Sequence, residues 1–241
     1  MKTTLKIMVL FISILLTSCN ANLNIGDGIE GSGNVITEKR KITDSFTKIK
    51  ASTGVEVILE QGNTTEIEVE IDDNLIEYVI TKVENGTLIA KIDGNITTSE
   101  VIIIRIKTAE IDGLKASSGA SIRSKNTLRG TNITFETSSG SVINADLEYE
   151  KVVSEASSGS EITLSGKALI VETSSSSGST INAKDLAANE IIAESSSGSN
   201  TTVNPIVFLN AKATSGSTIE YIQDAKKIIK KEGSGGSIFK K

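Results

Sequence analysis

The amino-acid sequence predicts an all-β protein whose main part is a parallel β-solenoid (β-helix) with coils of about 19 residues. Ser-Gly pairs recur at nearly constant spacing in the second half of the chain, and aliphatic residues keep fixed offsets from them. Hydrophobic residues make up 38% of the composition, but Phe, Trp and Tyr only 3%. A core must therefore be built from Ile, Val, Leu and Ala, and this composition favours strands.

Residues 1–18 have the features of a bacterial lipoprotein signal peptide. Lys2 and Lys6 precede an apolar segment over residues 7–16, which is too short to span a bilayer. The segment ends in Leu-Leu-Thr-Ser before Cys19, which resembles a lipobox, so we predict lipidation of Cys19 and a membrane partner through the acylated N-terminus. An ordinary secretory signal that contains a cysteine is the alternative.

Residues 19–34 are predicted to be a tether, because the segment is rich in Asn and Gly and has little apolar content. Asn20 follows the cysteine, where an Asp often marks retention in the inner membrane. We therefore expect a lipoprotein of the cell envelope, located in the outer membrane where the host has one.

The Ser-Gly pairs are predicted to form a ladder of structural turns. The first six are Ser118-Gly119, Ser139-Gly140, Ser158-Gly159, Ser177-Gly178, Ser197-Gly198 and Ser215-Gly216, and Ser234-Gly235 is a seventh. The residue three positions after the glycine is Ile in six of these seven copies, and most copies have an aliphatic residue seven positions before it. In the fourth copy, the run Ser174 to Ser177 is expected to break this second register.

Odd offsets from the glycine place these apolar residues on one face of extended strands. Each unit then reads as strand, Ser-Gly turn, strand and return, and units stacked about 4.8 Å apart bury the isoleucines on one another. We expect glycine at the turn because of a positive φ or a close backbone approach, and a ladder of hydroxyls from the serines before it. A flexible Ser/Gly linker and a sandwich with Ser-Gly hairpins are the alternatives.

The solenoid is predicted over residues 111–241, and its last 16 residues hold six lysines that form a basic C-terminal cap. Residues 35–110 form a β-rich part in which Asn85-Gly86 predicts a hairpin. Residues 46–61 match the turn pattern around Thr53-Gly54 and are a candidate early coil.

Charge and composition exclude several functions. The chain has no His, which removes His-based triads and His metal ligands. Without the leader, 23 basic residues face 30 acidic ones, a net charge of −7, so nucleic acid is not an expected partner. No cofactor is predicted.

Four carboxylates are candidate metal ligands. Glu136 and Glu155 occupy equivalent positions in adjacent coils, where a hard cation would relieve their repulsion. The alternative is a solvated surface row. Asp72 and Asp73 allow a similar guess, although Asp-Asp-Asn is also ordinary turn and cap chemistry. The prediction for the chain is no metal, with these residues as the candidates.

Several segments carry a family resemblance: residues 31–34, 46–61, 72–75 and 85–88, together with the repeated Ser-Ser-Gly-Ser turns. They resemble the head GIN domain family, described as putative auto-transporter adhesins and common as lipoproteins, over roughly residues 31–225. The resemblance implies a β-helical fold at the cell envelope and no catalytic residues. Residues 20–24 lack the acidic cluster associated with surface export of such lipoproteins, so surface exposure and a periplasmic orientation both stay open.

We expect a non-enzyme that offers an extended Ser/Thr/Asn-rich surface to a glycan or an envelope protein. Two alternatives stay open: a periplasm-facing scaffold without a small ligand, and a β-helix protein that binds or processes polysaccharide. Processing enzymes of this architecture need clustered charges in a cleft. The short coils, which lack insertions, offer no obvious place for one.

Overall fold

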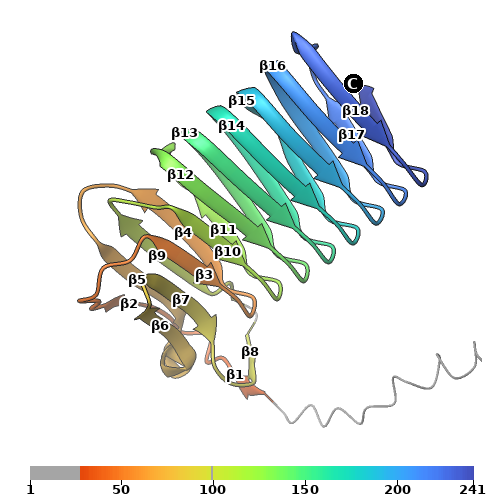
Figure 1. The fold of residues 1–241 in the computed structure, drawn as a ribbon. Coiled ribbons are helices and arrows are strands. Elements are labelled where there is room, and N and C mark those ends of the chain that lie inside the picture. The colour runs from red at the N-terminus through yellow and green to blue at the C-terminus, as the bar shows by residue number, and fades with distance from the viewer. Residues whose placement is uncertain (1–27, 99) are drawn as a thin grey trace, which may run out of the picture.

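The structure, a computed structural model, describes residues 28–98 and 100–241 and confirms the parallel β-solenoid (Figure 1). One sheet of 17 strands winds through the described chain, and the short strands β1 and β8 pair separately. The elements are β1 (Ile29–Glu30), β2 (Val35–Arg40), β3 (Lys48–Ala51), β4 (Glu56–Gln61), β5 (Glu66–Asp72), the 3-10 helix η1 (Asp73–Tyr78), β6 (Val79–Glu84), β7 (Thr87–Ile92), β8 (Ile96–Thr97), β9 (Ile103–Thr108), β10 (Gly113–Ala116), β11 (Ser121–Ser124), β12 (Leu128–Thr137), β13 (Val142–Ala156), β14 (Glu161–Ser175), β15 (Thr180–Ser195), β16 (Asn200–Ala213), β17 (Thr218–Tyr221), β18 (Lys227–Glu232) and β19 (Ser237–Lys240).

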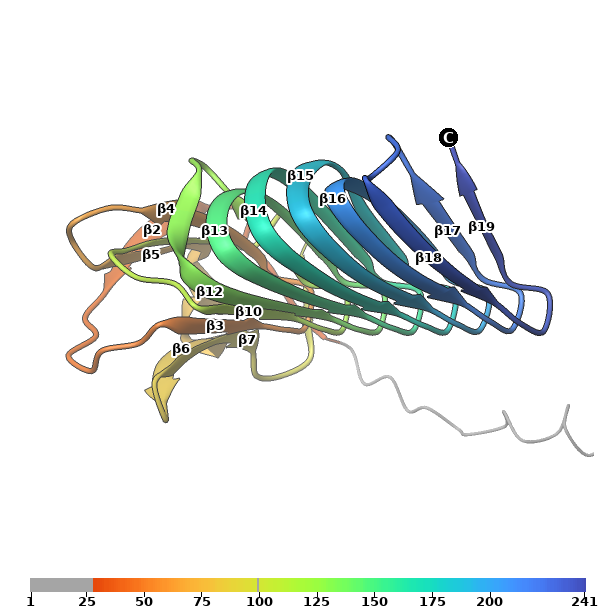
Figure 2. The same ribbon diagram turned by 45° about the horizontal axis from the view of Figure 1, so that its top comes forward.

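Each central coil is one long strand that bends around the body and ends at a Ser-Gly turn. Strands β13 to β16 are 14 to 16 residues long, and each pairs in parallel with the next. The return segment that we expected to be a separate connection is itself extended and curved (Figure 2). Its backbone groups therefore pair with neighbouring coils along most of the circuit.

The expected aliphatic rows fill the interior. Residues three positions after the turn glycine are buried in all seven coils, and the register stacks Ile143 on Ile162 and Ile162 on Ile181. The expected break in the fourth coil is wrong. Val171 lies seven residues before Gly178, is fully buried, and pairs in register with the coils on both sides. The serine run begins only after this position.

Coils of unequal length differ at the bend and keep the turns aligned. The register between β14 and β15 shifts after Thr163, and that between β15 and β16 shifts after Ala183 and again after Ala188. These bulges absorb the glycine spacings of 20 and 18 residues. The strands entering and leaving each turn remain in phase.

The N-terminal part closes the first end of the solenoid. Strands β6 and β7 form the predicted antiparallel hairpin around Asn85-Gly86. Strands β2, β5 and β9 pair antiparallel, whereas β3 and β4 pair in parallel with β10 and β11. Residues 46–61 therefore stack directly under the first Ser-Gly repeat, with Thr53 and Gly54 at positive φ in their own turn.

The Ser-Gly pair forms a type I′ turn in which both residues have positive φ. In the fourth coil φ is 53° at Ser177 and 70° at Gly178, and the Ser179 N–H donates to the Ser176 carbonyl at 3.2 Å. A Cβ added to Gly178 would meet nothing within 4 Å. The glycine is thus needed for its conformation rather than for a close approach. The Gly178 N–H also donates to the Ser197 carbonyl of the next coil at 3.1 Å.

Of the two serines that flank the turn glycine, the one after it is buried and the one before it is exposed. Ser179 is buried, accepts from the Ser176 N–H at 3.2 Å and donates to the Ala156 carbonyl of the preceding coil at 2.8 Å. The equivalent serines are Ser141, Ser160, Ser199 and Ser217. Ser177, by contrast, is exposed, and its hydroxyl has no hydrogen-bond partner among the described residues. The turns are therefore linked by backbone hydrogen bonds between successive coils. The hydroxyls that bond to the preceding coil are those of the serine after the glycine, not of the serine before it.

Charged side chains lie across the last coil, where the basic cap is predicted. The Lys230 ammonium lies 4.6 Å from the centre of the Tyr221 ring and donates to its hydroxyl at 2.9 Å. The Glu232 carboxylate accepts from the Ile238 N–H at 2.5 Å. Lys230 and Glu232 occupy strand positions that are apolar or small in most earlier coils, so they end the interior rows with polar groups.

The turn conformation yields a first prediction. Replacing Ser177 with Asn should raise the midpoint of thermal unfolding slightly, because Asn tolerates positive φ and Asn-Gly favours this turn. Replacing Ser177 with Val should lower the free energy of unfolding by about 1 kcal/mol, because a β-branched residue tolerates positive φ less well than Ser, which already bears part of that cost. Chemical denaturation of the two variants measures the difference, and equal stabilities would contradict the assigned turn.

Candidate functional site

The outward-facing residues that precede the Ser-Gly turns form one long surface, called here the groove face. It consists of the residues two, four and six positions before each turn glycine, from β3 through β10 and β12 to β16. Four open hollows adjoin along it, with volumes of about 560, 250, 350 and 200 Å³. Lys115 and Glu136 line both the first and the second hollow. Ser174 lines the second, third and fourth hollows. The hollows form one shallow groove that crosses the coils.

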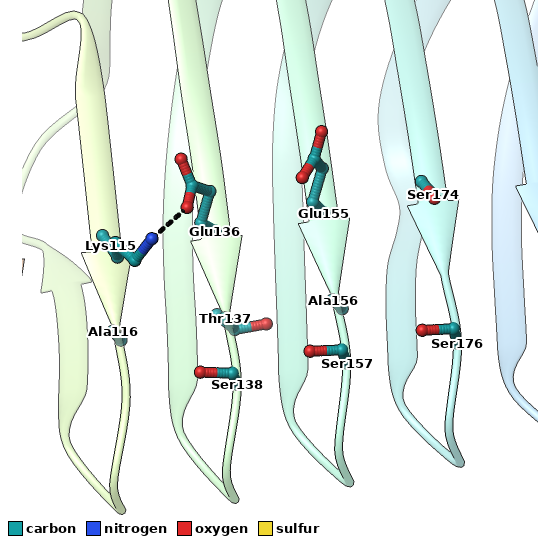
Figure 3. A pocket seen from close by; sticks show the side chains of 10 residues that line it. All are labelled: Lys115, Ala116, Glu136, Thr137, Ser138, Glu155, Ala156, Ser157, Ser174 and Ser176. Atoms are coloured by element: carbon teal, nitrogen blue, oxygen red, sulfur yellow. Dashed lines mark hydrogen bonds and ion pairs between the residues drawn. The ribbon is translucent and has the colours of Figure 1, made fainter.

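Charged residues follow one another along the centre of the groove face. The row four positions before the glycine reads Lys50, Lys115, Glu136, Glu155, Ser174, Glu194, Lys212 and Lys231, each in register with the next. It is basic at both ends and acidic in the middle. The Lys115 ammonium contacts the Glu136 carboxylate at 2.5 Å (Figure 3), and Lys212 lies 4.0 Å from Glu194.

A row of hydroxyls runs beside these charges. It consists of Ser117, Ser138, Ser157, Ser176, Ser196 and Thr214, all half-buried. In Figure 3, the side chains of Ser138, Ser157 and Ser176 point in the same direction, each toward the preceding coil. Their backbone N–H groups are held by the buried serine of the same turn. Their hydroxyls line the second hollow and can donate to or accept from a ligand.

Glu136 and Glu155, the two glutamates proposed to share a cation, do lie on adjacent coils. Glu136 pairs in register with Glu155, but Lys115 already contacts Glu136 from the other side. Over residues 28–98 and 100–241, no three His, Cys, Asp or Glu side chains lie close enough to hold a metal ion together. The ammonium of Lys115 offsets part of the charge that a cation would otherwise neutralise.

Asp72, the third metal candidate, is buried and holds the start of the folded chain. Its Oδ1 accepts from the Gly33 N–H at 2.8 Å, and its Oδ2 accepts from the Thr98 hydroxyl at 2.6 Å. Both carboxylate oxygens therefore have protein donors. A buried carboxylate with such partners is stabilised by them without a metal.

Asp73 binds the same segment from outside. It accepts from the Ser32 hydroxyl at 2.5 Å and from the Asn34 side-chain amide at 2.9 Å. These hydrogen bonds, that from Ser32 first, lower the pKa of the Asp73 carboxyl. With Asp72, they form a clasp on residues 31–34, the last part of the predicted tether. Residues 29–30 also pair with β8, so the chain is attached to the body from there on.

Cys19, the predicted lipidation site, lies outside the described residues, as do the predicted signal peptide and the first part of the tether. Sequence reasoning did not find the groove. Extending the turn alignment back to Gly54 would have placed Lys50 at the head of the charged row. The first hollow, which Gly113 lines, could not be predicted from the repeat, because it depends on a single glycine in one coil.

Comparisons with known proteins agree with this geometry. The model of the family described as "Putative auto-transporter adhesin, head GIN domain" matches residues 45–225. No curated protein matched the chain. Among solved structures, a putative adhesin from Bacteroides fragilis superposes with a TM-score of 0.82 at 22% identity, over 89% of this chain and all of that one.

Two further solved structures share the fold. A putative adhesin from Parabacteroides merdae has a TM-score of 0.73 at 20% identity, over 89% of this chain and 99% of that one. A putative lipid binding protein from Parabacteroides distasonis has a TM-score of 0.72 at 20% identity, over 88% and 99%. At these identities, the similarity concerns the fold alone.

The clasp yields a prediction on pH. Because hydrogen bonds to the ionised form lower the pKa of Asp73, its side-chain carboxyl should titrate below the ordinary aspartate value of about 3.9. The contribution of Asp73 to stability is then complete above about pH 4 and is lost as the pH falls through the lowered pKa. An NMR titration of the carboxyl carbon measures the midpoint. Replacing Ser32 with Ala should raise this midpoint, and an unchanged midpoint would contradict the assignment.

Proposed function

The chain belongs to the head GIN domain family of putative auto-transporter adhesins, and from this premise we propose that it is a non-catalytic, lipid-anchored binding protein of the cell envelope. Its partner is an extended molecule, either a glycan or an envelope protein. The partner lies along the groove face and contacts several coils at once.

The observation that carries this proposal is the continuity of the groove across successive coils. Each coil adds one charged or polar residue and one hydroxyl, and the coils repeat about every 4.8 Å. An extended partner can therefore repeat similar contacts along its length. Solenoids commonly bind through such extended surfaces.

Two features support a non-catalytic role. The family is described as putative auto-transporter adhesins, a description that names no reaction. The groove carboxylates, such as Glu155 and Glu194, are exposed in hollows open to solvent. Catalytic carboxylates instead depend on an enclosing cleft that shifts their protonation and orients the substrate.

The anchor and the clasp would act together to hold the body near a membrane. Eight residues lie between Cys19 and Gly28, and the nine extended residue steps from one to the other reach at most about 32 Å. From Ile29 onward the chain is held by β8, Asp72 and Asp73. Lipidation at Cys19 would then keep the N-terminal end of the folded body close to the membrane surface.

In the described part of the chain, none of the helical structure is long and apolar enough to cross a membrane.

A periplasm-facing scaffold is the second candidate. Stacked coils with paired backbone groups make a rigid rod, and such a rod can separate or align envelope components without binding a small ligand. A third candidate, a protein that binds or processes polysaccharide, uses the same groove. If it processes the polysaccharide, its activity on that ligand would distinguish it from the non-catalytic binding protein.

Blocking the groove tests the binding proposal. Ser174 is exposed and lines three adjoining hollows, so replacing it with Arg should abolish binding of the glycan or envelope protein found with the wild type by array or crosslinking. Replacing Thr163 with Arg, on the opposite face of the same coil, is the control and should leave binding unchanged. Both variants should unfold at the wild-type temperature. Equal binding by both would count against the groove.

Fractionation of cells tests the anchor. Replacing Cys19 with Ser should move the protein from the membrane fraction to the soluble fraction, because the acyl chains provide the attachment. Protease added to intact cells should degrade the wild-type protein if it is an adhesin. Survival on intact cells, with degradation after lysis, would replace adhesion by the periplasmic scaffold.

A further inference from the structure

The first hollow of the groove lies where the N-terminal part meets the solenoid. Its volume is about 560 Å³, the largest of the four on the groove face. Strands β3, β10 and β12 lie side by side there (Figure 1) and contribute Lys48 and Lys50, Gly113 and Lys115, and Thr134. Three ammonium groups thus surround one hollow.

A missing side chain opens this hollow. Gly113 stands in register between Lys48 and Thr134, at a position where the later coils carry side chains such as Val153 and Ile192. A Cβ at Gly113 would lie 3.1 Å from the Lys48 Cγ. A side chain at this position would therefore press against the Lys48 side chain and change how it faces the hollow.

Two of the three ammonium groups have no ion-pair partner. Among the described residues, Lys48 and Lys50 make no ion pair within 4.0 Å, although Lys50 lowers the pKa of Glu84 through space as the least of several causes. On the opposite face, by contrast, basic residues at similar depth are paired: Arg105 with Glu70, Arg123 with Glu56 and Lys125 with Glu60, at 2.6 to 2.8 Å.

The acidic residues of the hollow are already engaged. Asp112 accepts from the Thr47 hydroxyl at 2.9 Å, and Glu136 contacts Lys115. Asp112 keeps its negative charge, but three lysines and two carboxylates line the hollow, so its net charge is +1 and an incoming anion is attracted to the unpaired ammonium groups of Lys48 and Lys50. Thr134, Asn132 and Thr87 line the same hollow and offer neutral hydrogen-bonding groups beside them.

We propose that this hollow binds the carboxylate of an acidic sugar at the end of a glycan, an inference that rests on the proposed function. The carboxylate accepts charge-assisted hydrogen bonds from Lys48 and Lys50. The neutral remainder of the glycan continues along the groove. A uniform polyanion does not fit, because Glu136, Glu155 and Glu194 follow in the same row and would repel it.

The test compares two oligosaccharides that differ only in a terminal carboxylate-bearing sugar. Wild-type protein should bind the acidic one at least tenfold more tightly by calorimetry, and the preference should weaken with added salt. Replacing both Lys48 and Lys50 with Gln should remove the preference. Replacing both Lys167 and Lys184 with Gln, at exposed positions along the bend and outside the groove face, changes the charge equally and should leave it intact.

A second variant changes the space of the hollow without changing its charge. Replacing Gly113 with Thr places a Cβ 3.1 Å from the Lys48 Cγ, so it crowds the hollow and shifts the Lys48 side chain. It should also remove the preference, and circular dichroism should show that the variant keeps its β-structure. Tight binding of the acidic oligosaccharide by this variant would overturn the proposed site.

The remaining outcomes distinguish this inference from the proposed function. The acidic-sugar site would be overturned, and the groove retained, if the protein bound both oligosaccharides equally. In that case Ser174→Arg would abolish the binding, whereas Lys48→Gln with Lys50→Gln would not. Binding of neither, with no effect of Arg at Ser174 on any partner, would overturn both. Lysine-dependent binding of vesicles with anionic lipids, without binding of the oligosaccharide, would assign the hollow to a lipid headgroup and overturn the glycan.

Discussion

The parallel hydrogen-bond ladder between successive coils is the interaction on which the rest of the structure depends. It links the turns as well as the strands, because the glycine N–H of each turn donates to the serine carbonyl of the next coil at 3.0 to 3.2 Å. Once this ladder is set, every residue has a fixed neighbour one coil away. The interior rows, the buried hydroxyls and the groove face all follow from that neighbour relation.

The ladder also explains where the chain tolerates irregularity. A slip of one residue would turn every side chain of a coil from the interior to the surface, so register must be held near the turn. Extra or missing residues are confined to the bend, where the pairing of β14, β15 and β16 shifts. The strand before each turn stays in phase with its neighbours. The groove is therefore continuous even though the coils differ in length.

Sequence reasoning could predict features that repeat and could not predict those that depend on a single exception. The isoleucine rows follow from spacing alone, whereas the turn glycine allowed either a positive φ or a close backbone approach, and the structure shows the positive φ. The left-handed serine before the glycine, the buried hydroxyl of Ser179 and the continued register at Val171 needed the actual pairing. The clasp of Asp72 on Gly33 joins residues 39 positions apart and has no periodic signal. The hollow at Gly113 likewise depends on one missing side chain.

The division between rows also indicates where function can vary. The interior rows must keep small or aliphatic residues, because volume changes in a packed core are costly. The outward rows have no such constraint, and the groove face accordingly changes from Lys to Glu to Ser and back to Lys within one row. A single exposed charge pair is worth at most about 1 kcal/mol. Strong binding along this face therefore requires a partner long enough to engage several coils. Under the proposed function, the unpaired Lys48 and Lys50 at the hollow beside Gly113 would fix the direction of a bound chain, and the remaining coils would add affinity.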